Sequence, residues 1–458
     1  MLKQRDLPIL AGAAVAVYFL SLTAWGIGAH FAPDDLQNIY RYWSVSTWEL
    51  VRANLQVATG FYRPLGALFY LPLYRWFGFN PLPYRLVIFA VVVLNAWLLY
   101  CLARRITESR EAGAFAVLIG CFHASAIAAF YSTAVVYEDL CCLFTTGAVL
   151  YYVRARQESG ILMWKQTVIF LLLSAAALNS KEMAVVIAPA VVLWELFNRG
   201  ERRGHGAALV AIVLLTAAYA YAKAGSQNSF SQFGEAYRPV FTVTRYMETM
   251  SVYSGFLFNS TEPLSHTETV LLWVVLAAMA FIMRNRAMIF GVSFAWIAFL
   301  PVNFVTAREG FVLYIPMIGL GIYCGALISA MLRFIRPAES RNELGALVFL
   351  VVLALLCAAH VPPARTLFGY MESAQRVTWQ ILQDFREQKL HFRSGENVYF
   401  ANTPFSDWDI YFMAKLWARD PSVNVAISGP GKPEIRGDIH DNFTQVFRFE
   451  GAKLLRVK

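Results

Sequence analysis

The fold is decided near the N-terminus by an uncharged apolar run, LPILAGAAVAVYFLSLTAWGIGA (residues 7–29). A helix needs about 20 mostly apolar residues to cross the roughly 30 Å hydrocarbon core of a bilayer. The run is long enough to do so, and it is too long for the apolar part of a signal peptide. Lys3 and Arg5 precede it. We therefore expect a signal-anchor helix that is retained in the protein.

Composition extends this interpretation to the whole chain. Of its 458 residues, 58% are hydrophobic and 15% are charged, whereas soluble domains have about 25% charged residues. This balance excludes a disordered chain, a collagen-like or coiled-coil rod and an ordinary cytosolic enzyme. Further apolar blocks follow the first, which gives about eleven predicted transmembrane helices. These blocks are residues 83–102, 112–131, 135–153, 164–178, 183–197, 207–222, 270–283, 287–304, 311–332 and 344–359.

The basic residues of the short loops predict the orientation, because lysine and arginine gather on the cytoplasmic side of membrane proteins. Together with Lys3 and Arg5, the basic residues of alternate loops fall on one side of the predicted membrane. They are Arg104, Arg105, Arg110, Arg154, Arg156, Lys165, Arg199, Arg202, Arg203, Arg284, Arg286, Arg333, Arg336 and Arg341. We expect a multi-pass protein of the plasma (inner) membrane with a cytoplasmic N-terminus and an extracytoplasmic C-terminus. The net charge of +9 then records topology, and we expect no nucleic-acid partner.

Three larger segments lie on the predicted outer face: the loops 30–82 and 223–268, and the tail 361–458. We interpret residues 1–360 as a transmembrane domain and the tail as a small soluble α/β domain. The tail pattern indicates helices at 366–390 and 407–419, strands at 397–401 and 423–428, and a hairpin at 444–457.

Charged residues near the outer ends of the spans are the candidate site. Asp34 and Asp35 stand just past the first span. Adjacent carboxylates repel each other, which raises the proton affinity of one of them and suits a general base. The same pair also suits the N-terminus of a helix, as a cap in favourable contact with the helix dipole. The sequence leaves both interpretations open.

Other charged residues break the rules for membrane segments. Arg63 could bind an anion or anchor an interfacial helix. Glu138 and Asp139 begin a predicted span, where charge is costly unless it faces a polar cavity. Lys181 lies in a short outer turn, against the orientation rule, and calls for a partner, either Glu182 or a substrate phosphate.

Topology alone places the two acidic pairs with Arg63, Lys181 and Arg308 at one membrane face. Such a mixture suits an anionic lipid-linked substrate, because the cations would hold its phosphate while a carboxylate takes a proton. The six cysteines all lie in predicted spans, where packing explains them better than a disulfide framework. No His–Glu spacing argues for a metal site.

The motifs around these residues resemble the GT-C superfamily of polytopic glycosyltransferases, which use polyprenyl-phosphate-linked sugars. Within it, the resemblance is to protein O-mannosyltransferase-like enzymes, especially the membrane part of the tetratricopeptide-linked O-mannosyltransferases. It covers roughly residues 1–335. The matching motifs are DD (34–35), YRPL (62–65), FGFNP (77–81), SKE (180–182), LPVN (300–303), Arg308 and YIP (314–316).

Two features depart from that family. The segment YEDL (137–140) stands where the related enzymes usually have Gly-Arg-Ala-Glu/Asp-Leu, so only Asp139 carries over. The tail carries no tetratricopeptide repeat of about 34 residues, which implies a different mode of acceptor recognition.

The resemblance implies an inverting transfer of a hexose, such as mannose or glucose, from a polyprenyl-phosphate donor to an acceptor hydroxyl at the outer face. Asp34 would be the general base, and Asp35 would shape the acceptor site or share the proton. Arg63, Lys181 and Arg308 would bind the donor phosphate. The acceptor or sugar site would contain Tyr62, Glu138, Asp139, Glu182 and Tyr314. The sequence does not decide whether the enzyme requires a divalent metal. It also does not decide whether the acceptor is a protein, a glycan or a lipid.

Two other classes remain in competition. A transporter or lipid flippase usually carries ionisable residues near the bilayer midplane and shows repeated halves with broken helices, features that we do not find in the sequence. The third interpretation is a non-catalytic assembly or receptor protein whose outer tail binds a partner.

Overall fold

The computed structural model describes residues 7–56, 61–160, 162–197, 206–225, 238–335, 341–404, 409–429 and 442–458. Several residues of the predicted cytoplasmic loops lie outside this part of the chain: Lys3, Arg5, Arg199, Arg202, Arg203 and Arg336.

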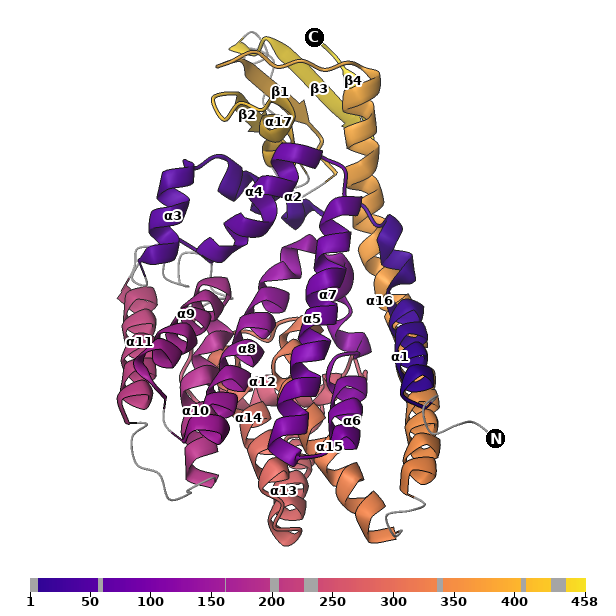
Figure 1. The fold of residues 1–458 in the computed structure, drawn as a ribbon. Helices are drawn as coiled ribbons and strands as arrows, with labels where there is room; N and C mark the ends of the chain where they lie inside the picture. The colour runs from indigo at the N-terminus through magenta and orange to yellow at the C-terminus, as the bar shows by residue number, and fades with distance from the viewer. Residues whose placement is uncertain are drawn as a thin grey trace.

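Helices form a bundle with a smaller sheet-containing part at one end (Figure 1). Each predicted span coincides with helical structure. The helices are α1 (Leu7–Thr23), α5 (Leu82–Thr107), α6 (Arg110–Gly120), α7 (Ala128–Tyr131), α8 (Val136–Ser159), α9 (Trp164–Ser180), α10 (Ile187–Phe197), α11 (Gly206–Gly225), α13 (His266–Ile282), α14 (Arg286–Asn303), α15 (Pro316–Ile335) and α16 (Arg341–Glu387). A further helix, α12 (Val243–Phe256), packs against α13 and α14.

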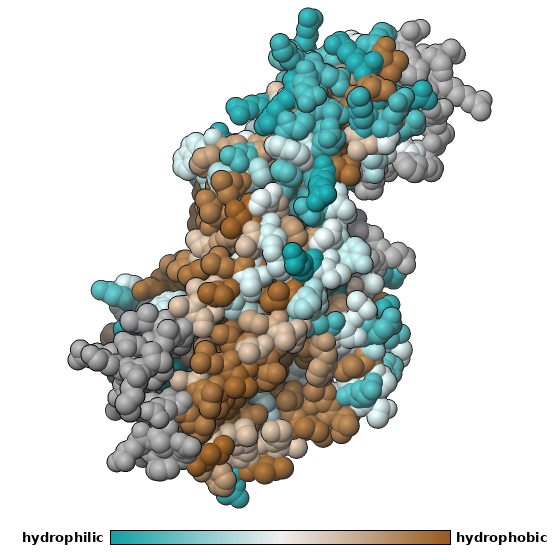
Figure 2. Space-filling view, turned by 90° about the vertical axis from the view of Figure 1, so that its right-hand side faces the viewer, coloured by the Kyte–Doolittle hydropathy of each residue, from teal (hydrophilic) through white to brown (hydrophobic). Residues whose placement is uncertain are grey.

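The chain is an integral membrane protein. By length and composition, six helices within the described residues could cross a membrane, or up to eight if each of two bent helix pairs is one span. One bent pair joins α6 to residues 124–131 at an angle of 62°, which is where the sequence predicts a single span. Brown hydrophobic residues cover much of the bundle surface in Figure 2, and teal hydrophilic ones gather on the opposite end. The count of eleven stays a prediction.

Close helix packing sets the centre of the bundle. A Cβ atom on Gly319 of α15 would overlap the carbonyl of Gly291 on α14, and one on Gly325 would overlap the carbonyl of Ala112 on α6. Glycine lets helix backbones approach closely, as in other membrane helix pairs. The glycines of α15 therefore let this helix pack closely against α14 and α6.

Three short helices of the predicted outer loop 30–82 lie above the bundle in Figure 1: α2 (Pro33–Trp43), α3 (Thr47–Leu55) and α4 (Ala67–Phe77). The angle between residues 12–28 and α2 is 74°, so the chain turns sharply after the first span. Ser46 caps α3 by accepting a hydrogen bond from the Glu49 amide. These helices place the acidic pair between the bundle and the C-terminal sheet.

The predicted last span and the predicted first helix of the tail are one helix. α16 runs without a break from Arg341 to Glu387 and contains Pro362 and Pro363. Proline usually ends or kinks a helix because it lacks an amide hydrogen, which is why the sequence pattern divides this region. The domain boundary predicted at residue 361 thus falls inside α16, which reaches from the far end of the bundle to the sheet in Figure 1.

A four-stranded sheet follows α16, in the order β2-β1-β3-β4. Its strands are β1 (Asn397–Ala401), β2 (Asn424–Ile427), β3 (Gln445–Glu450) and β4 (Lys453–Arg456), and α17 (Asp409–Ala418) lies between β1 and β2 in the chain. β1 is parallel to β2 and β3, whereas β3 and β4 form an antiparallel hairpin. These elements agree with the strands, helix and hairpin that the sequence pattern predicts.

The sheet-containing part contacts α2 and α4 of the loop 30–82 through α17. Tyr40 of α2 packs its ring against Tyr411 and Phe412 of α17, at centroid distances of 6.1 and 5.2 Å. The Tyr74 hydroxyl of α4 donates a hydrogen bond of 2.7 Å to the Leu416 carbonyl. The C-terminal segment is therefore in direct contact with the loop that carries the acidic pair.

Candidate active site

The adjacent Asp34 and Asp35 have different environments. Both lie in the first turn of α2. Asp34 is exposed, whereas the Asp35 side chain is fully buried. An Asp35 oxygen accepts a 2.7 Å hydrogen bond from the Ala32 amide, and the other accepts one of 2.6 Å from the Ala134 amide. The capping interpretation is confirmed for Asp35, and Asp34 is the member of the pair that solvent can reach.

A buried arginine compensates the charge of Asp35. Arg85 Nη2 of α5 lies 3.9 Å from Asp35 Oδ2, and both side chains are inaccessible to solvent. The same nitrogen donates a 2.7 Å hydrogen bond to the His30 carbonyl. Asp35 therefore fixes the start of α2 against α5 and the chain after α7. This anchoring holds Asp34 in place.

A chain of hydrogen bonds runs from α2 down to the cations. The Asn38 amide donates to the Asp34 carbonyl at 3.0 Å and accepts from the Tyr137 hydroxyl of α8 at 2.9 Å. The Tyr42 hydroxyl lies 3.0 Å from the Tyr137 hydroxyl and donates to the Arg63 carbonyl at 2.7 Å. From the sequence, Tyr137 has no role beyond its place in the YEDL segment (137–140). It connects the helix of Asp34 to the residues around Arg63.

Arg63 makes a two-point contact with Glu182. Its Nη2 donates to Glu182 Oε2 at 3.0 Å and its Nε to Oε1 at 3.4 Å. The guanidinium also lies over the rings of Tyr62 and Tyr137, at 4.4 and 5.0 Å from their centroids. Burial by itself would raise the pKa of Glu182, but the charges of Arg63 and Lys181 lower it below its ordinary value. The carboxylate is thus ionised and holds Arg63 at the site.

The backbone of Arg63 is unusual as well. Its φ is 52°, in the left-handed region that non-glycine residues rarely adopt. Such conformations are retained where surrounding contacts over-determine them, and they cluster at functional sites. Here the Tyr42 hydrogen bond and the Glu182 pair supply those contacts.

Lys181 pairs with Glu138 of α8, and both side chains are almost completely buried. The sequence offered Glu182 or a phosphate as its partner; the protein partner is Glu138 instead. The reason is the extended backbone of Lys181 (φ −161°, ψ 153°), which directs consecutive side chains to opposite sides. The ammonium also lies 5.1 Å from the centroid of the Phe311 ring. Glu138 Oε2 has no hydrogen-bond partner within the described part of the chain.

Asp139 and Tyr314 form a separate, deeper group. Asp139 is fully buried, and neither carboxylate oxygen has a hydrogen-bond partner among the described residues. The Asn95 amide of α5 donates to the Asp139 carbonyl at 3.0 Å and to the Tyr314 hydroxyl at 3.3 Å. Buried unpaired carboxylates are rare in proteins and call for a functional explanation.

Arg308 begins the short segment that leads to Phe311 and Tyr314. Its amide donates a 3.2 Å hydrogen bond to the Tyr253 hydroxyl of α12, and the residue is half-buried. Phe311, three residues later, contacts Lys181. The structure thus connects the Arg308 segment to the Lys181–Glu138 pair through Phe311.

Two residues near the cations were missed at the sequence level. Lys223, in the last turn of α11, donates a 3.1 Å hydrogen bond to the Phe61 carbonyl. Tyr219, one turn earlier, is buried at 3% exposure. Lys223 carried the same signal as Lys181, a basic residue at the outer end of a predicted span, but it was interpreted only as the start of the second outer loop.

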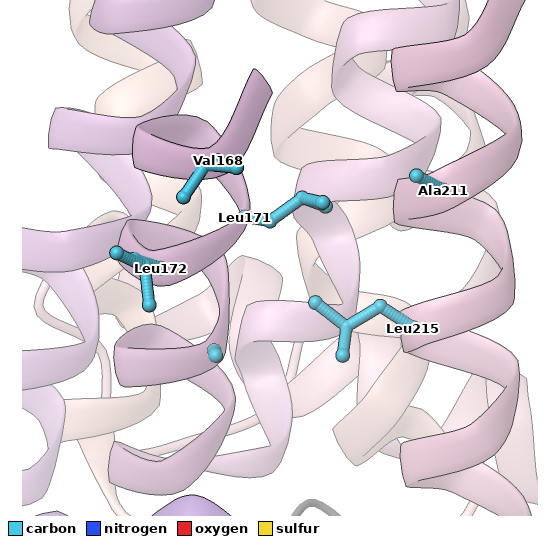
Figure 3. Close-up of a pocket in the computed structure, with 6 residues that line it drawn as sticks. Val168, Leu171, Leu172, Ala211 and Leu215 are labelled. Carbon is cyan, nitrogen blue, oxygen red and sulfur yellow. The ribbon is translucent and has the colours of Figure 1, made fainter. Parts of the chain in front are cut away.

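An apolar groove lies between α9 and α11, with a volume of about 390 Å³. Its lining is Val168, Leu171, Leu172, Ala175, Ala211 and Leu215. Figure 3 shows Leu171 and Leu215 extending into the space between the two helices. The same helices carry charge at one end, because Lys181 follows the last residue of α9 and Lys223 lies near the end of α11. The groove therefore lies between the two helices whose ends carry Lys181 and Lys223.

The described residues contain no group of three or more histidine, cysteine, aspartate or glutamate side chains arranged to hold a metal ion. The resemblance left a divalent metal open. The charges available at this site are those of the paired arginine, lysines and carboxylates.

Comparison with known proteins gives similarity at two levels. A comparison with curated proteins finds no matching sequence. Among solved structures, the chain is similar to ArnT from Cupriavidus metallidurans in the apo state, with 15% identity and a TM-score of 0.46 over 93% of this chain and 86% of ArnT. The form of ArnT bound to undecaprenyl phosphate matches with 16% identity and the same TM-score and coverage. This similarity is too low to transfer residues between the chains.

Residues 63–222, about a third of the chain, match the family model described as dolichyl-phosphate-mannose-protein mannosyltransferase. The matched segment begins at Arg63 and includes the Glu138–Lys181 pair, Glu182 and the groove. Over this segment the chain is similar to glycosyltransferases, in agreement with the resemblance of its motifs to the GT-C superfamily. Within that superfamily, the matching model is that of the protein mannosyltransferases.

Proposed function

We propose that the protein transfers a hexose, such as mannose or glucose, from a polyprenyl-phosphate-linked donor to an acceptor hydroxyl on the extracytoplasmic face, with inversion at the anomeric carbon. The observation that carries this proposal is the arrangement of Asp34 relative to Arg63. Asp34 has an exposed carboxylate at the start of α2. Its backbone carbonyl is connected through Asn38, Tyr137 and Tyr42 to the backbone carbonyl of Arg63, whose guanidinium is held by Glu182.

In this mechanism Asp34 removes the proton from the acceptor hydroxyl as its oxygen attacks the anomeric carbon. The bond from that carbon to the phosphate oxygen breaks, and the electron pair leaves with the polyprenyl phosphate. Arg63, Lys181 and Arg308 stabilise the negative charge of the leaving phosphate. Lys223 joins them as a fourth cation near Arg63 and Glu182. Asp139 and Tyr314 would contact the sugar or acceptor, together with Tyr62.

The groove between α9 and α11 supports a lipid-linked donor. Its six lining residues are all apolar, as an isoprenoid chain requires. Leu215 lies eight residues before Lys223 on one helix, which is roughly 12 Å along the axis. A prenyl chain in the groove would therefore lie with its phosphate end toward the cations.

The test is Asp34→Asn in membranes supplied with labelled polyprenyl-phosphate sugars. We expect transfer to fall by about 10²-fold or more, the usual contribution of a general base, while the protein still folds because Asp34 is exposed. Glu49→Gln is the matched control, since Glu49 is an exposed carboxylate of α3 in the same loop, and it should leave transfer unchanged. Full transfer by Asp34→Asn would refute the assigned base. Movement of the labelled donor across the membrane without product would instead support a transporter.

A further inference from the structure

The contact between α2 and α17 brings a second carboxylate toward Asp34. The two helices pack through Tyr40, Tyr411 and Phe412. Asp409 is the first residue of α17 and is only 7% exposed. It comes from the C-terminal segment, which the resemblance to the GT-C enzymes does not cover.

Among the residues that the structure describes, no opposite charge pairs with the buried Asp409. Within the described residues, no hydrogen bond or ion pair to its carboxylate is formed, and the charged group that acts on it is Asp34. Lys415, on the same helix, donates to the Pro421 carbonyl at 2.8 Å and lies over the Tyr411 ring at 4.5 Å. A buried carboxylate beside another carboxylate favours its protonated form, because each negative charge disfavours the other.

The pKa of Asp409 reflects this environment. Burial first, and then the negative charge of Asp34, raise the pKa of its carboxyl to about 7. The first position of a helix normally favours a negative charge, so burial and repulsion outweigh the helix dipole here. Other ionisable groups lie on the elements packed around α17. They include Asp35, Tyr40, Arg41 and Tyr42 on α2, Tyr70, Tyr74 and Arg75 on α4, Asp384 and Arg386 on α16, and Tyr411 and Lys415 on α17 itself. The β2 strand, NVAI, carries none.

We propose that Asp409 is a positioning residue for the general base Asp34: it keeps a proton at the junction of α2 and α17, so that the pair carries one negative charge, located on Asp34. This inference rests on the proposed function and names a part of the site that belongs to the C-terminal segment. A protonated Asp409 would leave the exposed Asp34 as the acceptor of the substrate proton. After the transfer both carboxyls are protonated, and Asp34 returns its proton to water because it is exposed.

The same arrangement gives a direction to the pH dependence. As the pH rises through about 7, Asp409 loses its proton, and its negative charge is then repelled by that of Asp34 on the neighbouring helix α2. If the protonated form is required, kcat should fall roughly 20-fold between about pH 6.5 and about pH 8.5. The elevated pKa also means that the contact is most stable at low pH and loses stability as the pH rises toward 7.

The experiment compares pH profiles of kcat for the wild type, Asp409→Asn and Asp420→Asn. Asparagine at 409 keeps an amide donor and cannot ionise, so this variant should match the wild type at pH 6.5 and lose most of the decline toward pH 8.5. Asp420 is a half-buried carboxylate just beyond the other end of α17, so Asp420→Asn should retain the wild-type profile. If the profiles of Asp409→Asn and an active wild type coincide, the inference is overturned while the proposed function stands.

A second measurement does not depend on sugar transfer. Hydrogen exchange of the α17 amides, corrected for the intrinsic effect of pH, should show wild-type protection decreasing from pH 6.5 to pH 8.5 and Asp409→Asn protection staying constant. Equal pH dependence of protection in the two proteins would contradict the proposed coupling between Asp34 and Asp409. If the wild type transfers none of the polyprenyl-phosphate sugars, the proposed function fails, and this measurement still decides whether Asp34 and Asp409 are coupled.

Discussion

Arg63 Nη2 lies 3.0 Å from Glu182 Oε2, although the two residues are 119 positions apart in the chain. The contact joins the loop 30–82 to the turn between α9 and α10. Both side chains are largely buried, at 15% and 16% exposure. A phosphate that binds here therefore meets an arginine whose orientation is already fixed by a carboxylate and by the rings of Tyr62 and Tyr137.

Arg63→Lys should lower kcat/KM for the lipid-linked donor by about tenfold or more, because an ammonium cannot reproduce the two-point, stacked contact of a guanidinium. Steady-state transfer in detergent or membranes measures the effect. Arg52→Lys on α3 is the control, since Arg52 is exposed and its replacement should change nothing. An unchanged kcat/KM for Arg63→Lys would remove Arg63 from the phosphate site.

Variants of the Lys181–Glu138 pair can distinguish a loss of stability from a loss of activity. Glu138→Gln leaves a buried ammonium without a counter-charge, which should cost about 3–5 kcal/mol of stability, whereas replacing both residues by methionine should recover most of it. We expect the double variant to have a Tm close to that of the wild type and still to be inactive. Transfer by that stable double variant would mean that Lys181 is purely structural.

Asp35→Asn should damage the fold where Asp34→Asn does not. The substitution leaves Arg85 fully buried with no carboxylate near it, and breaking such a pair costs about 3–5 kcal/mol. Lower Tm and lower yield of folded protein are expected. A Tm within experimental error of the wild type would show that the Ala32 and Ala134 hydrogen bonds suffice for the anchor.

The His30–Trp379 stack should make stability depend on acidity. The ring centroids lie 4.2 Å apart, and the angle between the ring planes is 4°. Burial, and after it the charge of Arg85, lowers the pKa of His30 below 6.5. The unfolded chain then takes up a proton first as the pH falls, so this stabilisation is present above about pH 6.5 and is lost below it. The Tm of His30→Phe should fall less than that of the wild type from pH 7 to pH 5. His391→Phe, at an exposed histidine, should show the wild-type decline; an equal decline in His30→Phe would contradict the assignment.

Filling the groove between α9 and α11 should select against long lipid chains. Leu215→Trp places a larger ring between the helices, so we expect KM to rise for a donor with a long prenyl chain and to change little for a short-chain analogue. Leu94→Trp on α5 is the matched control, because Leu94 is 49% exposed and lies outside the groove. Equal KM changes for both chain lengths would place the prenyl chain elsewhere.

Periodicity predicted the helices and the C-terminal strands because both depend on local sequence. It could not predict that α16 continues past Pro362 and Pro363, since the contacts of α16 with other helices are not local. The sequence placed Arg63, Lys181 and Glu182 at one face, but not the choice of partners. That choice depends on the backbone direction at Lys181 and on the helix that brings Glu138 beside it. Asp34 and Asp35 were indistinguishable in sequence because burial, not residue type, separates them.

The length of α16 couples the two ends of the molecule. An unbroken helix of 47 residues extends about 70 Å and turns by about 100° per residue. Inserting or deleting one residue near its middle would therefore rotate everything that follows by that angle and shift it along the axis. The carboxylate of Asp409 could then no longer meet α2 in the same way. Variation in chain length along α16 should be tolerated only in steps that restore the helical phase. The length of this helix therefore determines both the distance of the C-terminal segment from the bundle and its rotation about the helix axis.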